Sequence, residues 1–445
     1  MYKREWQQQK ATMAMEKSVL KSELDLDDVG SSHSDVNRTG TSFGTFVNIV
    51  CAVAGTGILG LPYALKQGGW VALSLFFLGA AMAIYTSRML IECLYYKPGS
   101  RLHEFSDIGE AAFGKVGRYF VKVFQYSASL SLACIYILLA GLNIHRLILE
   151  YAEREILSLK LLVVISGLVV MVPFALLKSL KEVTVLSVFG ALCTVVVVIA
   201  VVVQGAIDVG QSDLPSTEPY VLSGLPLSFS TICFSYTGNV VFPHVEGTMK
   251  NPRSWNRVVT LSIVFVTALY IVTGVAGYAC YGDNVMSPVL NSLPKGVMSS
   301  MGYVLITLHV ILAAPIYLCS FALEQERWLG IDRSHMSASK EFLLRVLFRS
   351  SIVVILTLIA MFLPYFSDLM GLFGAVSGAL VVFLIPVTCH YKLFGWRHRT
   401  PLQHFGALVI LTVGVFGLVL GTSSSIQALS ASIQKGDSTT ASVTH

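Results

Sequence analysis

Eleven apolar segments, each roughly long enough to cross a lipid bilayer, account for most of the 445-residue sequence. A membrane-spanning helix requires about 20 consecutive, predominantly apolar residues. The composition agrees, because 54% of the residues are hydrophobic and only 13% are charged. The sequence therefore predicts an all-α polytopic membrane protein. The predicted spans are residues 43–66, 69–94, 119–146, 160–178, 182–207, 222–247, 256–281, 295–322, 342–363, 367–390 and 402–422.

Lysine and arginine are distributed unevenly between the two sides of the membrane that these spans define. With the amino terminus in the cytosol, 25 of the 31 Lys and Arg residues fall on the cytosolic side and 6 on the other. This asymmetry is typical of the positive-inside rule. We therefore expect a disordered cytosolic tail over 1–41, a transmembrane domain over 42–422 and a luminal or extracellular tail over 423–445.

The first span is interrupted at a depth where a membrane helix should be continuous. Ala54 to Pro62 contains three glycines and a proline, and the sixth span has a similar interruption at Thr237 to Pro243. Non-helical peptide groups are tolerated in hydrocarbon only where they are buried in protein or face a ligand or water. One such span alone is typical of a packing kink. Two interruptions in corresponding spans, five spans apart, predict an inverted repeat with a binding site at the breaks.

Motifs of other functional classes are missing from the sequence. It contains no GxxxxGK[ST] phosphate loop, no metal-spaced His/Glu set and no Ser/His/Asp group whose members would meet. The eight cysteines are isolated in apolar segments, which implies neither a disulfide nor a zinc site. The net charge of +5 arises from basic loops on one side, so we expect no nucleic-acid partner. These features predict a non-enzymatic membrane protein without a cofactor or metal, driven by an ion gradient or by its substrate's own gradient.

Few ionisable residues lie within the spans. Arg88 and Glu92 are four residues apart and are expected to pair near the cytosolic end of the second span. His309 lies in the middle of the eighth span, where it either bonds a neighbouring helix or relays protons. Glu246 follows His244 and the proline of the second break, and it is expected to carry a proton or to gate the cytosolic side by ion pairing.

Several motifs resemble the amino acid/auxin permease family. The run Gly57 to Ala64 with Gly68-Gly69-Trp70 is similar to the first-span signature, and Asp107 to Gly114 is similar to the loop after the second span. Phe234 to Pro243 and Glu246 to Pro252 resemble the branch that holds the vesicular inhibitory amino acid transporter and the vacuolar amino acid transporters. The resemblance covers roughly residues 42–422.

This resemblance implies an architecture and an activity. The architecture is a 5+5 inverted repeat like the bacterial leucine transporter fold, plus one extra helix, with helices 1 and 6 broken. The activity is secondary active, proton-coupled movement of an amino acid substrate by symport or antiport. The implied membrane is vacuolar, lysosomal or vesicular, with the plasma membrane second.

The breaks suggest how an amino acid would be recognised. The half-helix after the first break would offer free peptide N–H groups to a carboxylate. Unwound carbonyls of the sixth span would accept hydrogen bonds from an ammonium group. The candidate substrate-binding residues are Ala54, Gly55, Thr56, Gly57, Ile58, Phe234, Ser235, Tyr236, Thr237, Gly238, Tyr126 and Ser127. The candidates for coupling or gating are Glu246, His309 and Asn48.

Two alternatives stay open at this stage. Sodium coupling is one, because Asn48 matches an asparagine of sodium-coupled members of the family. Protons are favoured because the eighth span between His309 and Tyr317 lacks a Thr-Ser pair. The other is an amino-acid-sensing membrane protein that signals through its cytosolic tail. A channel is a weaker alternative, because no ring of charged residues is present.

Overall fold

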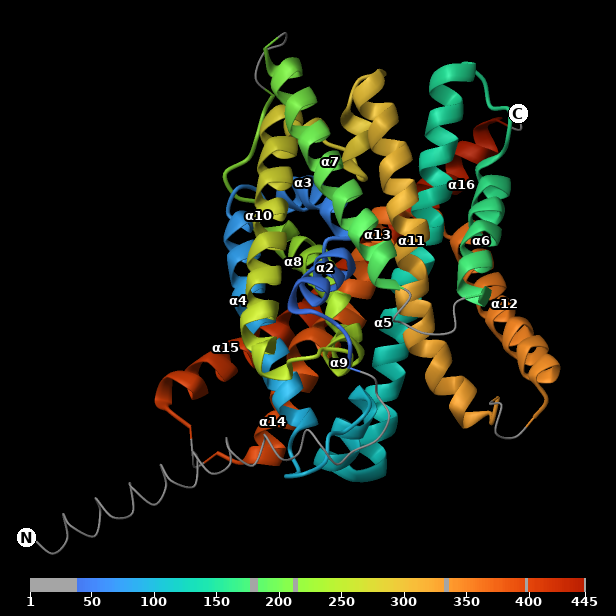
Figure 1. The fold of residues 1–445 in the computed structure, drawn as a ribbon. Coiled ribbons are helices and arrows are strands. Elements are labelled where there is room, and N and C mark those ends of the chain that lie inside the picture. The colour runs from blue at the N-terminus through green and yellow to red at the C-terminus, as the bar shows by residue number, and fades with distance from the viewer. Residues whose placement is uncertain (1–37, 177–182, 211–214, 332–335, 397–398, 444–445) are drawn as a thin grey trace, which may run out of the picture.

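The computed structural model describes residues 38–176, 183–210, 215–331, 336–396 and 399–443. Over these residues the chain is helical, and its extended pairing is limited to two isolated bridges (Figure 1). The α-helices are α2 (Ser42–Val53), α3 (Gly57–Gly68), α4 (Ala72–Leu94), α5 (Phe105–Ala152), α6 (Leu159–Leu176), α7 (Val183–Val209), α8 (Leu225–Ser235), α9 (Phe242–Gly247), α10 (Trp255–Tyr281), α11 (Val297–Trp328), α12 (Ala338–Phe362), α13 (Phe366–Phe373), α14 (Ile385–Phe394), α15 (Pro401–Phe416) and α16 (Thr422–Val443).

The described residues contain nine helical segments that are long and apolar enough to cross a membrane, or ten if α2 and α3 form one span bent by 49°. The predicted sixth span consists of α8, the 3-10 helix η4 (Thr237–Val241) and α9, each too short to cross alone. The all-α class is confirmed. The count of eleven spans stays a prediction.

Close contacts with other helices explain the glycines at the break in the first span. Helix α2 ends at Val53 and α3 begins at Gly57. A Cβ atom at Gly55 would lie 2.0 Å from the Tyr136 hydroxyl, and one at Gly57 would lie 2.7 Å from Ser235 Cα. Real Cβ atoms do not approach other atoms this closely, so only glycine fits at both positions. The first break is therefore shaped by contact with α5 and with the end of α8.

The second break also contacts the first break closely. A Cβ atom at Gly238 would lie 2.7 Å from the Ala52 carbonyl oxygen of α2. Pro243 occupies the first turn of α9, where its missing N–H has no helical partner to lose. The proline thus restarts the helix without disturbing it, and the two breaks contact each other directly.

The broken helices lie inside the bundle and the last helices lie at its edge. Figure 1 shows α2, α3 and α8 between α4, α10, α7 and α11. An 18-residue apolar window of Phe366–Phe394 is 72% buried inside the protein, whereas such windows of Ala338–Phe362 and Pro401–Lys435 are each 28% buried. The protein therefore encloses its two breaks and leaves α12 and α15 at its periphery.

Two predicted boundaries differ from the structure, and a third cannot be compared with it. The third span starts earlier, because α5 begins at Phe105 and is kinked at Gly114, whose φ of 68° ends a short amphipathic first part. The predicted end of the fourth span, beyond Leu176, lies outside the described residues. The last span does not end at residue 422, since α16 continues the helix and a Cβ at Gly371 of α13 would lie 3.1 Å from Ser425 Oγ.

Candidate functional site

The last carbonyls of α2 are capped by side chains from other helices. An α-helix leaves its final carbonyl groups without an internal partner, and burial makes such orphans costly. The hydroxyl of Tyr317 on α11 donates to the Ala52 carbonyl, and that of Thr194 on α7 donates to the Ala54 carbonyl at 3.3 Å. The end of α2 is thus held by hydroxyl groups rather than by a continuing helix.

Tyr270 of α10 joins the two breaks. Its hydroxyl oxygen lies 2.6 Å from the Val53 carbonyl oxygen and 2.7 Å from the Ser235 carbonyl oxygen. A phenol has one proton to donate, so it can bond only one of these carbonyls at a time. The other carbonyl keeps a lone pair for a second donor, such as a substrate ammonium.

The start of α3 is an uncapped helix amino terminus. Its N-cap residue Thr56 makes no side-chain cap bond, and the buried Thr56 hydroxyl has no hydrogen-bond partner, while the Tyr136 hydroxyl bonds the Thr56 backbone. Free N–H groups and the positive end of the helix dipole favour an anion here. The first break therefore places carbonyl groups next to N–H groups.

The candidate residues from Ala54 to Ile58 and from Phe234 to Gly238 come together at the contact between the breaks. Tyr236 turns its hydroxyl away, to Thr267 Oγ1 at 2.9 Å and the Phe76 carbonyl at 3.3 Å. The cavities that lie beside α4 and beside α9 include none of these candidates in their linings. All residues from Ala54 to Ile58 and from Phe234 to Gly238 are buried, so the protein is closed around the breaks in this conformation.

Tyr126 and Ser127 do not reach the breaks. The Tyr126 ring packs edge-on against Phe321 at 4.9 Å between centroids, and the Ser127 hydroxyl lies 2.7 Å from that of Ser377. The side chain of α5 that contacts the first break is Tyr136. The contact between α5 and the first break thus lies more than two turns farther along the helix than Tyr126 and Ser127.

The hydroxyl groups that contact the backbone of the breaks were not predicted from the sequence. They come from Tyr136, Thr194, Tyr270 and Tyr317. A signal was available for the tyrosines. A buried tyrosine hydroxyl usually has a hydrogen-bond partner, so a tyrosine in the middle of an apolar span indicates a polar group nearby. Which group it meets depends on the packing of separate helices.

His309 is linked to the first break through one side chain. Its Nδ1 lies 2.8 Å from the Gly190 carbonyl oxygen and 3.2 Å from Thr194 Oγ1, and Thr194 in turn donates to the Ala54 carbonyl. A carbonyl oxygen can only accept, so the network assigns the ring proton to Nδ1. The buried Nε2 has no partner and is left as an acceptor.

Glu246 is fully buried at the predicted cytosolic end of the sixth span and is surrounded by donors. Arg101 contacts its Oε2 atom through Nε at 2.8 Å and Nη2 at 2.7 Å. Tyr95 donates to its Oε1 atom at 2.5 Å, and Arg38 Nη1 lies 3.9 Å from the same atom. The carboxylate therefore fastens α9 to the end of α4, to the following loop and to the amino-terminal segment.

The amino-terminal segment is also paired to the chain after α9. The Gly40 N–H donates to the Thr248 carbonyl at 2.9 Å, and the Lys250 N–H donates to the Gly40 carbonyl at 2.8 Å. Asn48 lines a small cavity with His244, beside the same segment. The coupling and gating candidates Asn48 and Glu246 thus lie on one side of the breaks, whereas His309 contacts the first break through Thr194.

Arg88 and Glu92 do not form the predicted pair. Arg88 Nη2 instead donates to Thr260 Oγ1 of α10 at 2.8 Å, and Glu92 Oε2 lies 2.8 Å from His390 Nε2 of α14. The prediction was wrong because both side chains found partners on neighbouring helices.

A second charged cluster lies at the predicted cytosolic ends of α5 and α11. Glu104 Oε1 lies 2.7 Å from Arg327 Nη2, and Ser106 contacts both Glu104 and Glu324. Burial, followed by the neighbouring Glu324 carboxyl group, raises the pKa of Glu104 from 4.5 to about 7. This carboxyl group therefore titrates near neutral pH.

Comparison with known proteins agrees with this geometry. The chain is 29% identical to the Amino acid transporter AVT1J of Arabidopsis thaliana, over 91% of this chain and 95% of the relative. It is 28% identical to the Amino acid transporter AVT1I of the same plant, over 92% and 98%.

Solved structures with the same architecture include the nucleobase-cation-symport-1 family transporter Mhp1, with a TM-score of 0.55, 12% identity and coverage of 89% of this chain and 94% of that one. A manganese transporter of Eremococcus coleocola has a TM-score of 0.58, 15% identity and coverage of 91% and 97%. These similarities confirm the expected leucine transporter-like fold. A family model described as a transmembrane amino acid transporter protein matches residues 38–427, so this chain belongs to that family of membrane amino acid transporters.

Proposed function

We propose that this protein is a proton-coupled secondary active transporter that moves amino acids across a vacuolar, lysosomal or vesicle membrane. The single observation that carries the proposal is the contact between the two breaks, where Gly57 meets Ser235 and Gly238 meets Ala52. A site at this contact opens and closes as the two halves move apart and together, which is the basis of alternating access.

The polar groups at the contact support recognition of an amino acid backbone. The substrate carboxylate binds the first turn of α3, where Thr56 has an unpartnered hydroxyl. The ammonium group binds the carbonyl of Val53 or Ser235 that Tyr270 leaves free. Each charged end of the substrate thereby replaces part of its hydration with fixed dipoles.

The two ionisable candidates take different roles in this proposal. Glu246 is already held by Arg101 and Tyr95, so it closes the cytosolic side by fastening α9 to its neighbours. His309 has one free ring nitrogen and reaches the Ala54 carbonyl through Thr194. We assign the coupling proton to His309 and the gate to Glu246.

Proteoliposomes test this function directly. Uptake of labelled amino acids should rise under an imposed pH gradient and collapse when a protonophore is added. Uptake that follows a sodium gradient instead would overturn proton coupling. Specific amino acid binding without uptake under either gradient would favour the sensing alternative, for which the contact of Gly40 with the chain after α9 is the supporting observation.

A further inference from the structure

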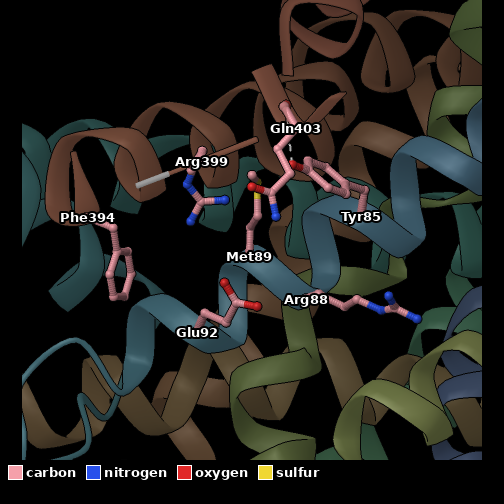
Figure 2. A pocket seen from close by; sticks show the side chains of 7 residues that line it. All are labelled: Tyr85, Arg88, Met89, Glu92, Phe394, Arg399 and Gln403. Atoms are coloured by element: carbon pink, nitrogen blue, oxygen red, sulfur yellow. Dashed lines mark hydrogen bonds between the residues drawn. The ribbon is translucent and has the colours of Figure 1, made fainter. Parts of the chain in front are cut away.

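A cavity separate from the helix breaks lies between α4, α14 and α15 (Figure 2). Its volume of about 440 Å³ is within the range of small-molecule sites. It opens at the end of the bundle that carries most of the basic residues, the predicted cytosolic side. Its polar and aromatic lining comes from Tyr85, Arg88, Glu92, Phe394, Arg399 and Gln403.

Exposed apolar side chains are close in the chain to the residues of α14 and α15 that line this cavity. Phe394, which lines it, is 39% exposed, while nearby Trp396, Leu402 and Phe405 are 64% to 78% exposed. Aromatic residues of this kind gather where a membrane meets water. The cavity therefore lies at the depth of lipid headgroups, and lipid chains can cover its apolar edge.

His390 Nε2 has two incompatible neighbours at the wall of the cavity. It lies 2.8 Å from Glu92 Oε2 and 2.9 Å from Arg399 Nη2. A carboxylate needs a donor and a guanidinium needs an acceptor, but one ring nitrogen supplies only one of these. The buried Nδ1 has no partner, so a proton placed there would be an orphan donor. The ring therefore carries its proton on Nε2 and donates it to Glu92.

Arg399 is left without an anionic partner as a result. Among the described residues it forms no ion pair, and its remaining contacts are the Tyr85 hydroxyl and the Tyr391 ring, 5.4 Å from the guanidinium carbon. Figure 2 shows its guanidinium group on the same side of the cavity as the Gln403 amide, while the Arg88 guanidinium points away.

Gln403 supplies a second donor next to Arg399. Its Oε1 accepts from the Thr400 N–H at 3.0 Å in the cap of α15, so the Nε2 group is available to the cavity. Glu92 faces the same space with its side chain 50% exposed. The cavity thus presents donors for an anion beside one carboxylate, and the His390 ring lies between the two.

We propose that this cavity binds the headgroup of an aminophospholipid, with its phosphate on Arg399 and Gln403 and its primary ammonium on Glu92. Arginine binds phosphate through paired N–H groups. Basic pockets between spanning helices on the cytoplasmic side are suited to lipid headgroups. The bound lipid joins α15, at the edge of the bundle, to α4 and α14, and so stabilises the transporter in the membrane.

The test uses delipidated full-length protein in detergent, to which phosphatidylethanolamine, phosphatidylserine, phosphatidylcholine or inorganic phosphate is added separately. Bound lipid is counted by native mass spectrometry, and the melting temperature is followed by tryptophan fluorescence. Phosphatidylethanolamine and phosphatidylserine should bind and raise the melting temperature more than phosphatidylcholine. Inorganic phosphate, which cannot use the apolar edge or Glu92, should give little shift.

Variants connect the effect to the cavity. Arg399→Gln should weaken aminophospholipid binding about tenfold or more, because a charge-assisted hydrogen bond is lost, and Arg399→Lys should restore part of it. Glu92→Gln should remove the preference over phosphatidylcholine. Lys392→Gln, an exposed site on α14 outside the cavity, is the matched control and should bind like the wild type. Equal affinity of wild type and Arg399→Gln would overturn the proposal, as would an equal shift with inorganic phosphate alone.

Discussion

A single methyl group at Gly57 should separate the two breaks. In the Gly57→Ala variant the new Cβ would lie 2.6 Å from Ser235 Oγ and 2.7 Å from Ser235 Cα. The second atom belongs to the backbone of α8, which cannot move aside by rotating a side chain. Overpacking of this kind typically costs about 1–3 kcal/mol, and the better helix propensity of alanine returns at most about 1 kcal/mol.

This cost falls on the closed conformation only, because the clash disappears when the halves separate. A net bias of up to about 2 kcal/mol changes the ratio of closed to open protein by up to roughly thirtyfold. Gly57→Ala should therefore reach the membrane, lose affinity for its amino acid substrate by a similar factor and transport slowly.

Gly60→Ala is the matched control on the same helix. Its Cβ would lie 2.8 Å from Met370 Cε, the end of a flexible side chain that can rotate away. The assay is the shift in melting temperature that amino acids produce in purified protein, together with proteoliposome uptake. If Gly57→Ala and Gly60→Ala bind and transport equally well, the breaks are packing kinks and our assignment of the substrate site is refuted.

Three further predictions concern the ionisable groups. His309→Gln should abolish pH-driven uptake but keep substrate exchange at equal pH, and unchanged pH dependence in proteoliposomes would remove His309 from coupling. Glu246→Gln should lower the free energy of unfolding by about 1–3 kcal/mol, because it leaves the buried end of Arg101 without its anion. In a double-mutant cycle, the Glu246→Gln/Arg101→Gln variant should lose less stability than the sum of the two single variants. Strict additivity would contradict the ion-pair gate. The pKa of Glu104, about 7 in the protein against 4.5 for the free group, means that the folded state binds more protons between these values. The contribution of Glu104 to stability is therefore full below about pH 4.5 and is lost as the pH rises through about 7. Melting curves across this range should show the loss in wild type and not in Glu104→Gln.

The sequence alone determined the class of protein and the place of the breaks. These features follow from local rules. A bilayer requires long apolar helices whatever surrounds them, and a glycine-rich, proline-containing stretch interrupts a helix because of its own backbone properties. For this reason the break between Ala54 and Gly57 could be predicted within the first span, and the second break at Thr237 in the sixth.

Only the tertiary structure decided which side chains serve those breaks. Tyr270 and Tyr317 are far from Val53 and Ala52 in the chain, and nothing in their own spans indicates that they cap α2. Tyr126 was a candidate on the third span, but the rotation and depth of α5 bring Tyr136, and not Tyr126, into contact with the first break.

The partners of the charged residues were likewise decided by the tertiary structure. The spacing of Arg88 and Glu92 permitted a pair on one helix face, worth only about 0.2–0.5 kcal/mol. A contact of that size is easily replaced, and in the folded protein Thr260 and His390 from two other helices replaced it. Spacing along the chain specifies which contacts are possible, whereas the packing of distant helices selects among them.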